Sequence, residues 1–460
     1  MTGLEKIRTG HGRFVDRVII FGRYPIPGKT KTRLAPVLGP AGAAELQRVL
    51  TEGILQTASA FSSNGKADIV FCFEGGSKEQ VVRWIGRDVP CSRQNPGDLG
   101  ERMYAALRNA FKKGRRRVVL VGTDIPALTP LHLATAFDAL KENDIVVGPS
   151  TDGGYWLIGM KQPCDLFSHV SWSTPVVLEE TLGKAKSQGL KVRLLHTLRD
   201  IDTFEDLIQL GLEGKIKKPY VSVVLPALNE AENVAAAIES AQCPDSQVIV
   251  VDGGSSDATA QKASDAGALV LRSSRGRALQ QNKGGEIAVG SVLLFLHADT
   301  RLPRGYVNHV FEVLMDRSVA AGAFLFRSEI NHPFIKFIET MTNLRSRCLR
   351  LPYGDQALFL RKETFQSVGG FPDVPIAEDL YLVSRLSKAG KIRLAPAHIL
   401  TSGRQWQKIG IFRNSLINIL IAASCAMGIS PHTTKRIFRG GERALEGAQG
   451  DQGFPWRTTR

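Results

Sequence analysis

Two aspartates follow hydrophobic runs in the same way, one in each half of the 460-residue chain. Residues 292–296 (VLLFL) lead to His297 and Asp299, and residues 117–121 (RVVLV) lead to Asp124. Both runs are typical of buried parallel strands, and ligands of open α/β sheets bind at the carboxyl ends of such strands. A carboxylate there is suited to a divalent cation bound to phosphate oxygens, and turn capping is the alternative role.

A basic loop in the first half is suited to a phosphorylated ligand. Lys29, Lys31 and Arg33 lie in a loop restricted by two prolines and Gly28, which places cations beside backbone N–H groups. The spacing differs from that of a P-loop, and a solvated basic loop is the alternative interpretation.

A second acid in the first half follows residues 144–149 (DIVVGP), which are also expected to form a strand. Two glycines directly follow this acid, Asp152, and they let a ligand approach the backbone closely. Asp124 and Asp152 are therefore predicted to converge on one divalent cation. The alternative is that both aspartates cap turns.

The second half has further candidate residues at strand and helix ends. Asp252 follows a predicted strand at 248–251 and is suited to a base or ribose edge. Arg277 and Asn282 lie on a predicted helix, where a cation is suited to a diphosphate, although an exposed basic helix has the same pattern. Glu378 and Asp379 open another helix, where acids also favour the helix dipole.

The elements that carry these residues alternate between strand and helix, which predicts an α/β class. The rhythm restarts at a predicted strand over 220–225, after the charged stretch 213–219, and this marks a linker and a second domain. The predicted divisions are an extension at 1–16, a first domain at 17–212, a linker at 213–219, a second domain at 220–440 and a basic tail at 441–460.

Composition limits the partners and the compartment. The net charge of +15 favours anionic partners, but the basic residues are scattered without interleaved aromatics, so nucleic acid is not an expected partner. Six separated cysteines and a polar N-terminus favour the cytoplasm. The apolar segment 415–429 is short for a membrane span and is expected to form a packed or interfacial helix, which leaves peripheral membrane contact open.

The first half resembles a known family through six motifs in order within residues 18–212. They are GRYPIPGKTKTRLAP, PGDLGERM, VGTDIPALTP, GPSTDGGYWLIGM, SWSTPVVLEETL and DIDTFEDL. Together they resemble nucleotidyltransferase-like transferases of the arsenosugar-biosynthesis or selenium-associated glycosyltransferase family. The resemblance implies a GT-A-like, Rossmann-related fold that binds a nucleotide or nucleotide-sugar. Asp98 of the second motif is placed with Lys29, Lys31 and Arg33 on the nucleotide and phosphate side.

The second half resembles the inverting glycosyltransferases of family 2, and within them the arsenosugar-biosynthesis subgroup. The motifs, within residues 220–439, are SVVLPALNE, VVDGGSSDAT, GRALQQNKG, FLHADT, PYGDQALFL, GGF, AEDL and SGRQW. The resemblance implies a metal ligand, Asp299, and a catalytic base, Asp379, with Glu378 beside it. It further implies donor-binding and acceptor-side residues, which are Pro226, Ala227, Asn229, Glu230, Asp252, Arg277 and Asn282 for the donor and Gly354, Asp355, Gln356, Arg404 and Trp406 for the acceptor.

Two positions depart from the family pattern. His297 stands where the usual DxD triplet has its first acid, and Gln405 stands where the subgroup often has a second basic residue. The first departure leaves metal binding to Asp299 and the donor diphosphate, with His297 either a ligand or a packed strand residue. The second departure places a neutral amide where a basic residue would contact the acceptor or the diphosphate.

The physical requirements of the reaction agree with these roles. Inverting transfer needs one base for the acceptor and a metal for the leaving diphosphate, so separated carboxylates are expected. Retention by double displacement would need a second carboxylate close to the anomeric carbon, and no motif nominates one.

The combined hypothesis is a fusion of two GT-A-like α/β domains, each a mostly parallel sheet flanked by helices. The second transfers a sugar from a nucleotide-sugar to a small or lipid-linked acceptor with Mg²⁺ or Mn²⁺. The first binds a nucleotide-sugar or nucleoside triphosphate and forms the activated precursor. The main alternative is a regulatory protein that binds nucleotide-sugars and has one or both domains inactive.

Overall fold

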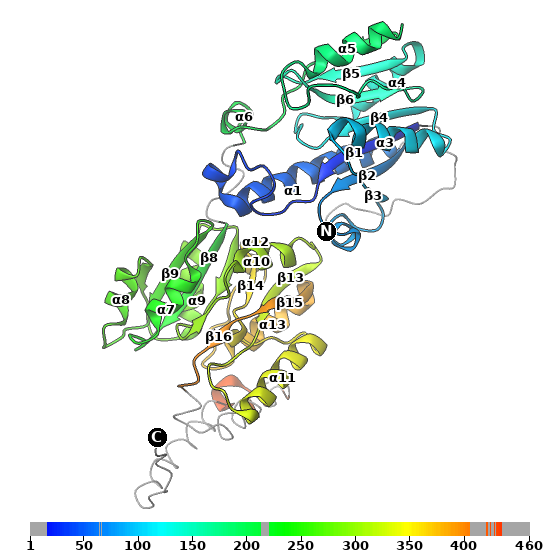
Figure 1. Ribbon diagram of the computed structural model, residues 1–460. Helices are drawn as coiled ribbons and strands as arrows, with labels where there is room; N and C mark the ends of the chain where they lie inside the picture. The colour runs from blue at the N-terminus through cyan, green and yellow to red at the C-terminus, as the bar shows by residue number, and fades with distance from the viewer. Residues whose placement is uncertain are drawn as a thin grey trace, which may run out of the picture. The chain divides into compact units, whose positions relative to one another are not determined.

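The computed structural model describes residues 16–63, 65, 67–212, 220–404, 420, 421, 424, 427 and 429–434. The chain divides into two compact units, Met1–Lys218 (unit 1) and Pro219–Arg460 (unit 2), which are coloured blue to green and green to red in Figure 1. The predicted linker and basic tail, residues 405–419 with Gln405 and Trp406, and all but Asp16 of the extension lie outside the described residues.

Unit 1 is built on one seven-stranded sheet with the order β3-β2-β1-β4-β6-β5-β7. Strand β6 is antiparallel to both of its neighbours, and the other pairs are parallel. The elements, in chain order, are β1 (Asp16–Arg23), α1 (Ala35–Ser62), β2 (Asp68–Glu74), α2 (Lys78–Ile85), β3 (Cys91–Arg93), α3 (Leu99–Lys112), β4 (Arg117–Gly122), α4 (Pro130–Glu142), β5 (Ile145–Pro149), β6 (Tyr155–Met160), α5 (Val177–Ser187), β7 (Val192–Leu194) and α6 (Phe204–Gln209).

Alternating apolar residues of the unit 1 strands place the sheet between two helical layers. Met103 and Leu107 of α3 and Ala185 of α5 pack with Ile19 of β1 and Leu120 of β4 on one face. Helices α1 and α4 pack against each other, where the rings of Phe61 and Phe137 stack. Both faces are therefore buried, as expected for parallel strands rich in Val and Ile.

Unit 2 is also built on one seven-stranded sheet, with the order β10-β9-β8-β11-β14-β13-β15, and a two-stranded ribbon of β12 and β16. The elements are β8 (Val221–Ala227), α7 (Val234–Ala241), β9 (Ser246–Asp252), α8 (Thr259–Asp265), β10 (Leu269–Arg272), α9 (Arg277–Ile287), β11 (Val292–Phe295), β12 (Thr300–Arg301), α10 (Tyr306–Leu314), β13 (Val319–Leu325), α11 (Pro333–Cys348), the 3₁₀ turn Gly354–Gln356, β14 (Phe359–Arg361), α12 (Lys362–Ser367), α13 (Glu378–Ala389), β15 (Lys391–His398) and β16 (Leu400–Thr401).

The core of unit 2 includes side chains of β11, the strand that precedes Asp299. Leu293 and Phe295 of β11 pack with Phe365 of α12, with Phe371 of the loop that follows α12, and with Leu382 of α13. Strand β11 is parallel to β8 but antiparallel to β14, so the expectation of a parallel strand holds on one side only. The reason is that the chain returns from α11 through a short turn and enters β14 in the opposite direction.

The two sheets have the same topology. When the strands of each sheet are numbered along the chain, both follow the order 3-2-1-4-6-5-7, with the sixth strand antiparallel to its neighbours. The expected α/β class, with two mostly parallel sheets flanked by helices, is confirmed. No helix in the described part of the chain is long and apolar enough to cross a membrane, and segment 415–429 lies mostly outside that part.

Candidate functional site

A cavity of 870 Å³ lies at the carboxyl ends of β8 and β11 in unit 2. Its walls come from the loops after these strands, the start of α9, the 3₁₀ turn and the start of α13. Eight of the residues expected from the sequence line this cavity, namely Pro226, Ala227, Glu230, Arg277, Asp299, Asp355, Glu378 and Asp379. These residues are separated by up to 153 positions in the chain, and the sheet brings them to one edge.

Asp299 is a largely buried carboxylate in this cavity. Burial, together with the nearby Glu230 carboxylate, raises the pKa of Asp299, while Arg404 and Arg277 act in the opposite direction. Within the described part of unit 2, no cation lies within ion-pair distance of Asp299, because Arg404 instead pairs with Glu230 at 2.5 Å. Asp299 is thus a largely buried carboxyl group without a direct counter-ion among the described residues.

His297 lies beside Asp299 in the lining of the cavity. Burial, helped by the charge of Arg277, lowers the pKa of His297 to about 3. The imidazole is therefore neutral at physiological pH, which is the form that either packs in a core or binds a metal.

The start of α9 presents an uncapped helix N-terminus to the cavity. The residue before the helix is Gly276, and no described side chain caps its N–H groups. Arg275 and Arg277 line the same wall, and the Arg277 side chain is half exposed, with its Nε 3.8 Å from Glu378. Free N–H groups beside a guanidinium form a site suited to a diphosphate.

The start of α13 holds Asp379 in a fixed orientation. Ala377, directly before the helix, has the left-handed φ of 61°, which turns the chain sharply into the cavity. The Gly354 N–H donates to one oxygen of Asp379 at 2.6 Å, and the Leu380 N–H donates to the other at 2.8 Å. Burial raises the pKa of the neighbouring Glu378, and Arg277 opposes this shift.

Asp355 brings a further carboxyl group to the wall of the cavity. Burial raises its pKa to about 6, against the charge of Arg345 and with the help of Asp379. Its Oδ1 is buried and has no hydrogen-bond partner among the described residues. An orphaned buried oxygen in a cavity wall is a suitable acceptor for a ligand hydroxyl.

Four other residues expected at the site bind the chain itself. Asn229 accepts from the Ser256 N–H at 2.9 Å and joins the loops after β8 and β9, and Asp252 accepts from the N–H groups of its own turn. Asn282 forms a reciprocal pair with the backbone of Phe371, and Gln356 is fully buried and donates to a backbone carbonyl. They hold the walls of the cavity, and direct ligand contact by them stays a prediction.

Gln280 is a residue of the site that the sequence did not single out. Its buried Nε2 donates to the carbonyl groups of Ala227 at 2.9 Å and Val251 at 2.7 Å, and so joins α9 to the ends of β8 and β9. In unit 1, Gln94 donates in the same way to Gly22 and Cys72, both at 3.1 Å. A glutamine before or inside a helix has no local pattern that would reveal this role.

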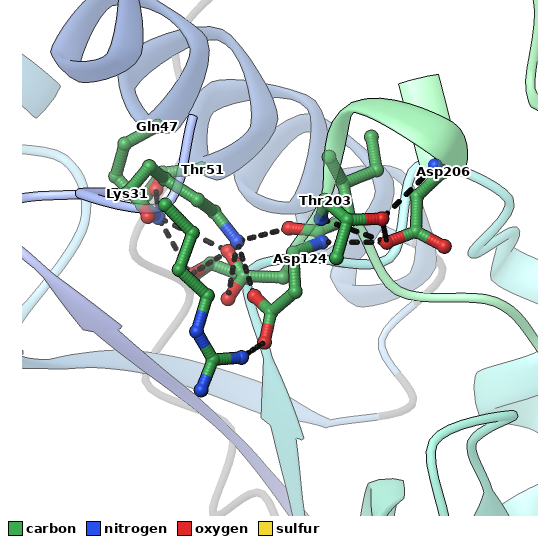
Figure 2. A network of polar contacts seen from close by, with 10 residues as sticks. Lys31, Gln47, Thr51, Asp124, Thr203 and Asp206 are labelled. Atoms are coloured by element: carbon green, nitrogen blue, oxygen red, sulfur yellow. Dashed lines mark hydrogen bonds and ion pairs between the residues drawn. The ribbon is translucent and has the colours of Figure 1, made fainter. Parts of the chain in front are cut away.

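In unit 1, Asp124 already has a cation of the same chain. Lys31 Nζ lies 3.0 Å from Asp124 and 3.2 Å from Asp202, and Figure 2 shows Lys31 and Asp124 in one network with Gln47 and Thr51 of α1. The Lys31 side chain is only 4% exposed. Lys31 is therefore a buried ion-pair partner in this structure and does not project from its loop toward solvent.

The other candidate residues of unit 1 are spread over several local structures. Lys29 is exposed, and Arg33 is largely exposed 3.6 Å from Asp202. Asp98 is the N-cap of α3, where its side chain accepts from the Glu101 N–H at 2.8 Å.

Asp152 caps its own turn by accepting from the Gly154 N–H at 2.9 Å. Gly153 in this turn has a φ of 88° and lies so close to Pro175 that a Cβ would clash. Burial and the nearby Asp152 raise the pKa of Asp200 to about 6.

The two units differ in how well they suit a divalent cation. No group of three or more His, Cys, Asp or Glu side chains in the described ranges is arranged to hold a metal ion alone. Mg²⁺ is commonly bound by one or two carboxylates together with substrate phosphates and water, and Asp299 beside the α9 N-terminus fits this pattern. Asp124 does not fit it, because Lys31 already contacts its carboxylate.

Family models match both units. Residues 57–174 match the model described as "Uncharacterized protein conserved in bacteria (DUF2064)", and residues 222–366 match the model "Glycosyl transferase family 2". The glycosyltransferase AglE of Haloferax volcanii is 27% identical over 190 residues, which are 37% of this chain and 62% of that protein. The chain thus matches less than two thirds of the length of this curated relative.

Solved structures similar to the chain include a protein of Desulfovibrio desulfuricans G20 described as a "putative nucleotide-diphospho-sugar transferase". It is 35% identical, with 43% of this chain and 86% of that chain covered and a TM-score of 0.41. The mannosyltransferase PcManGT of Pyrobaculum calidifontis, solved with GDP-Man and Mn²⁺, is 21% identical over 40% of this chain and 57% of that chain, with a TM-score of 0.33. The chain thus matches the DUF2064 model within unit 1 and the glycosyl transferase family 2 model within unit 2.

Proposed function

We propose that unit 2 transfers a sugar from a nucleotide-sugar donor to an acceptor hydroxyl, with inversion at the anomeric carbon. The observation that carries this proposal is the cavity, in which Asp299, the uncapped N-terminus of α9 and the oriented carboxylate of Asp379 share one space. The glycosyl transferase family 2 match over residues 222–366 supports it.

The donor side of the proposed site is formed by β8, β11 and α9. Pro226, Ala227 and Glu230 line the end of the cavity where the nucleoside would lie. The diphosphate would meet the α9 N–H groups and Arg277, and Asp299 would hold Mg²⁺ or Mn²⁺ against it. When bound, the metal would stabilise the charge of the leaving nucleoside diphosphate.

The acceptor side is formed by α13 and the 3₁₀ turn. The acceptor oxygen bonds to the anomeric carbon as the bond from that carbon to the diphosphate oxygen breaks, and Asp379 takes the hydroxyl proton. The negative charge leaves with the nucleoside diphosphate, close to Arg277 and the α9 N-terminus. Two backbone N–H groups fix the Asp379 carboxylate, so little reorganisation is needed at that atom.

We further infer the broader setting of the reaction from the sequence resemblance. The acceptor is a small or lipid-linked molecule, within arsenosugar-type chemistry, and the protein acts in the cytoplasm with peripheral membrane contact as an additional feature. Unit 1 binds a nucleotide or nucleotide-sugar and contributes to the activated precursor. The motivating observation is that the basic loop of unit 1 exposes Lys29 and Arg33, cations suited to phosphate groups.

The test is turnover by the full chain with a panel of nucleotide-sugars and Mn²⁺, measured as released nucleoside diphosphate. Asp379→Asn should reduce turnover by about 10²- to 10⁴-fold, the range of a general base, and should leave donor binding largely unchanged. The matched control is Glu363→Gln, an exposed carboxylate of α12 outside the cavity, which should keep full turnover.

Two results would contradict the proposal. Full turnover by Asp379→Asn would remove that residue as the base. Donor binding that Asp299→Asn abolishes, without turnover by the unmodified chain for any acceptor, would instead assign unit 2 to the regulatory class. NMR of the product anomer would decide between inversion and retention.

A further inference from the structure

Lys31 is surrounded by oxygen atoms in the way that a bound cation is. Its Nζ lies 3.0 Å from Asp124 Oδ2 and 3.2 Å from Asp202 Oδ1, and it donates to the carbonyl oxygen of Ile201. An ammonium group has three N–H donors, and each has an acceptor here. Two carboxylates and a backbone carbonyl are also the kind of ligands that hard divalent cations prefer.

The environment keeps this ammonium group charged. Burial lowers the pKa of Lys31, but the carboxylates of Asp124 and Asp202 outweigh that effect and raise the pKa above its ordinary value. The Lys31 side chain is 4% exposed, whereas the side chains of Asp124 and Asp202 are 38% and 45% exposed. The cation is therefore the enclosed member of the cluster, with the acids around it.

The approach of Lys31 depends on an unusual backbone conformation. Its φ of 50° lies in the left-handed region, which residues with a Cβ rarely adopt. The preceding loop is held by the Ile26 N–H, which donates to Thr30 Oγ1 at 2.9 Å. The loop thus keeps a strained residue that directs its ammonium group to the strand end.

We propose that Lys31 takes the place of a divalent cation in unit 1, so that the strand-end carboxylates Asp124 and Asp202 are held together without a metal ion. A divalent cation at this position would have to displace the buried ammonium group, because both are cations and both need the same oxygen ligands. Asp152 does not complete an alternative site, because it accepts hydrogen bonds within its own turn.

The comparison with unit 2 gives this inference its second support. Asp299 follows the corresponding strand of a sheet with the same order, and it has no ion pair with any described residue. One unit therefore supplies a cation from its own chain, and the other leaves the carboxylate available. The inference concerns unit 1 and does not depend on turnover by unit 2.

The experiment counts Mn²⁺ bound to the full chain by the loss of the free-ion signal in electron paramagnetic resonance. All variants carry Asp299→Asn, so that the proposed site of unit 2 does not contribute. The quantity compared is Asp124-dependent Mn²⁺, that is, the amount removed by adding Asp124→Asn. The Asp299→Asn chain should bind no Asp124-dependent Mn²⁺, and adding Lys31→Met should create a site for about one Mn²⁺ per chain.

Two further variants separate the role of Lys31 from general effects of charge and folding. Lys29→Met removes an exposed cation two residues away and should create no site. Lys31→Gln keeps a polar side chain and should create the same site if Lys31→Met fails to fold, as judged by its thermal transition. Asp124-dependent Mn²⁺ in the chain with intact Lys31 would overturn the proposal, and so would a folded Lys31 variant without it.

Discussion

The two units share a strand order, but they differ in whether the charged groups at the carboxyl edge of the sheet have partners among the described residues. In unit 1 the strand-end aspartate Asp124 pairs with Lys31, and the helix after the third strand, α3, is capped by Asp98. In unit 2 the corresponding aspartate, Asp299, has no ion pair with a described residue, and the corresponding helix, α9, has no side-chain cap. The same strand order thus gives one edge where the aspartate and the helix N-terminus have partners in the same chain, and one edge where both can bind a ligand.

This difference shows that strand order alone does not establish a ligand site. A cation site and an anion site are both possible at this edge, because it collects strand-end carboxylates and helix N-termini. Whether a ligand can use them depends on side chains that the same chain places there. The activity proposed for unit 2 therefore does not carry over to unit 1 by fold.

The largest expected effect comes from neutralising the two strand-end aspartates in turn. Asp299→Asn should reduce Mn²⁺-dependent turnover by more than about 100-fold, since a metal provides several kcal/mol of charge stabilisation. Asp124→Asn in the same assay should leave turnover by unit 2 unchanged. Nucleoside diphosphate release by each full-length variant across a Mn²⁺ titration measures the contrast.

Equal losses of turnover from both substitutions would contradict the proposed difference between the units, because both aspartates would then contribute to one reaction. Asp299→Asn should also shift the Mn²⁺ dependence of donor binding, while Asp124→Asn should not. A folded Asp299→Asn chain with unchanged Mn²⁺ dependence would show that Asp299 does not hold a metal ion.

The next effect concerns the buried carboxyl group of unit 2. The pKa of Asp355 is about 6 in the folded chain, above the ordinary value of 3.8, so the fold takes up a proton there between about pH 6 and 4. Stability attributed to this group therefore rises as the pH falls through that range and is lost above it. Asp355→Asn should stabilise unit 2 by up to about 3 kcal/mol at pH 7, since two pKa units correspond to roughly that free energy.

Chemical denaturation of the full chain at pH 7 and pH 4 measures this effect, with the difference between the variant and the parent disappearing at pH 4. A difference that is the same at both pH values would show that the cause is not the buried charge. The same substitution should reduce transfer if the unsatisfied oxygen of Asp355 binds the acceptor. Stability and activity would then change in opposite directions at one residue.

The sequence predicted the parts of unit 2 that depend on local patterns. The apolar run 292–296 and the helix opened by Glu378 and Asp379 were both found near their predicted positions, as β11 and α13. The cavity brings together eight of the expected residues, because strand ends of one sheet meet at one edge. The antiparallel entry of β14 was not predicted, since strand direction depends on the path of the chain and not on local composition.

Partners that are distant in the sequence could not be predicted. Lys31 and Asp202 are 171 residues apart, and a lysine in a basic loop has the same local pattern whether it faces a ligand or a carboxylate of its own chain. Gln280 and Asp355 were missed or incompletely interpreted for the same reason, because burial and hydrogen bonding depend on the packing of other elements. Residue types predicted which chemistry is present, and tertiary contacts decided which groups are free.

The smallest expected effect tests the N-terminus of α3 in unit 1, which Asp98 caps. Asp98→Ala should destabilise unit 1 by about 1 kcal/mol, because the side chain accepts from the Glu101 N–H in a reciprocal capping arrangement. Asp98→Asn keeps an accepting oxygen and should be nearly neutral. Tryptophan fluorescence during unfolding reports on unit 1, which contains Trp84, Trp156 and Trp172 of the five tryptophans. If Asp98→Ala were as stable as the parent chain, α3 would not depend on its own carboxylate, and its N-terminus would be as available to an external anion as that of α9.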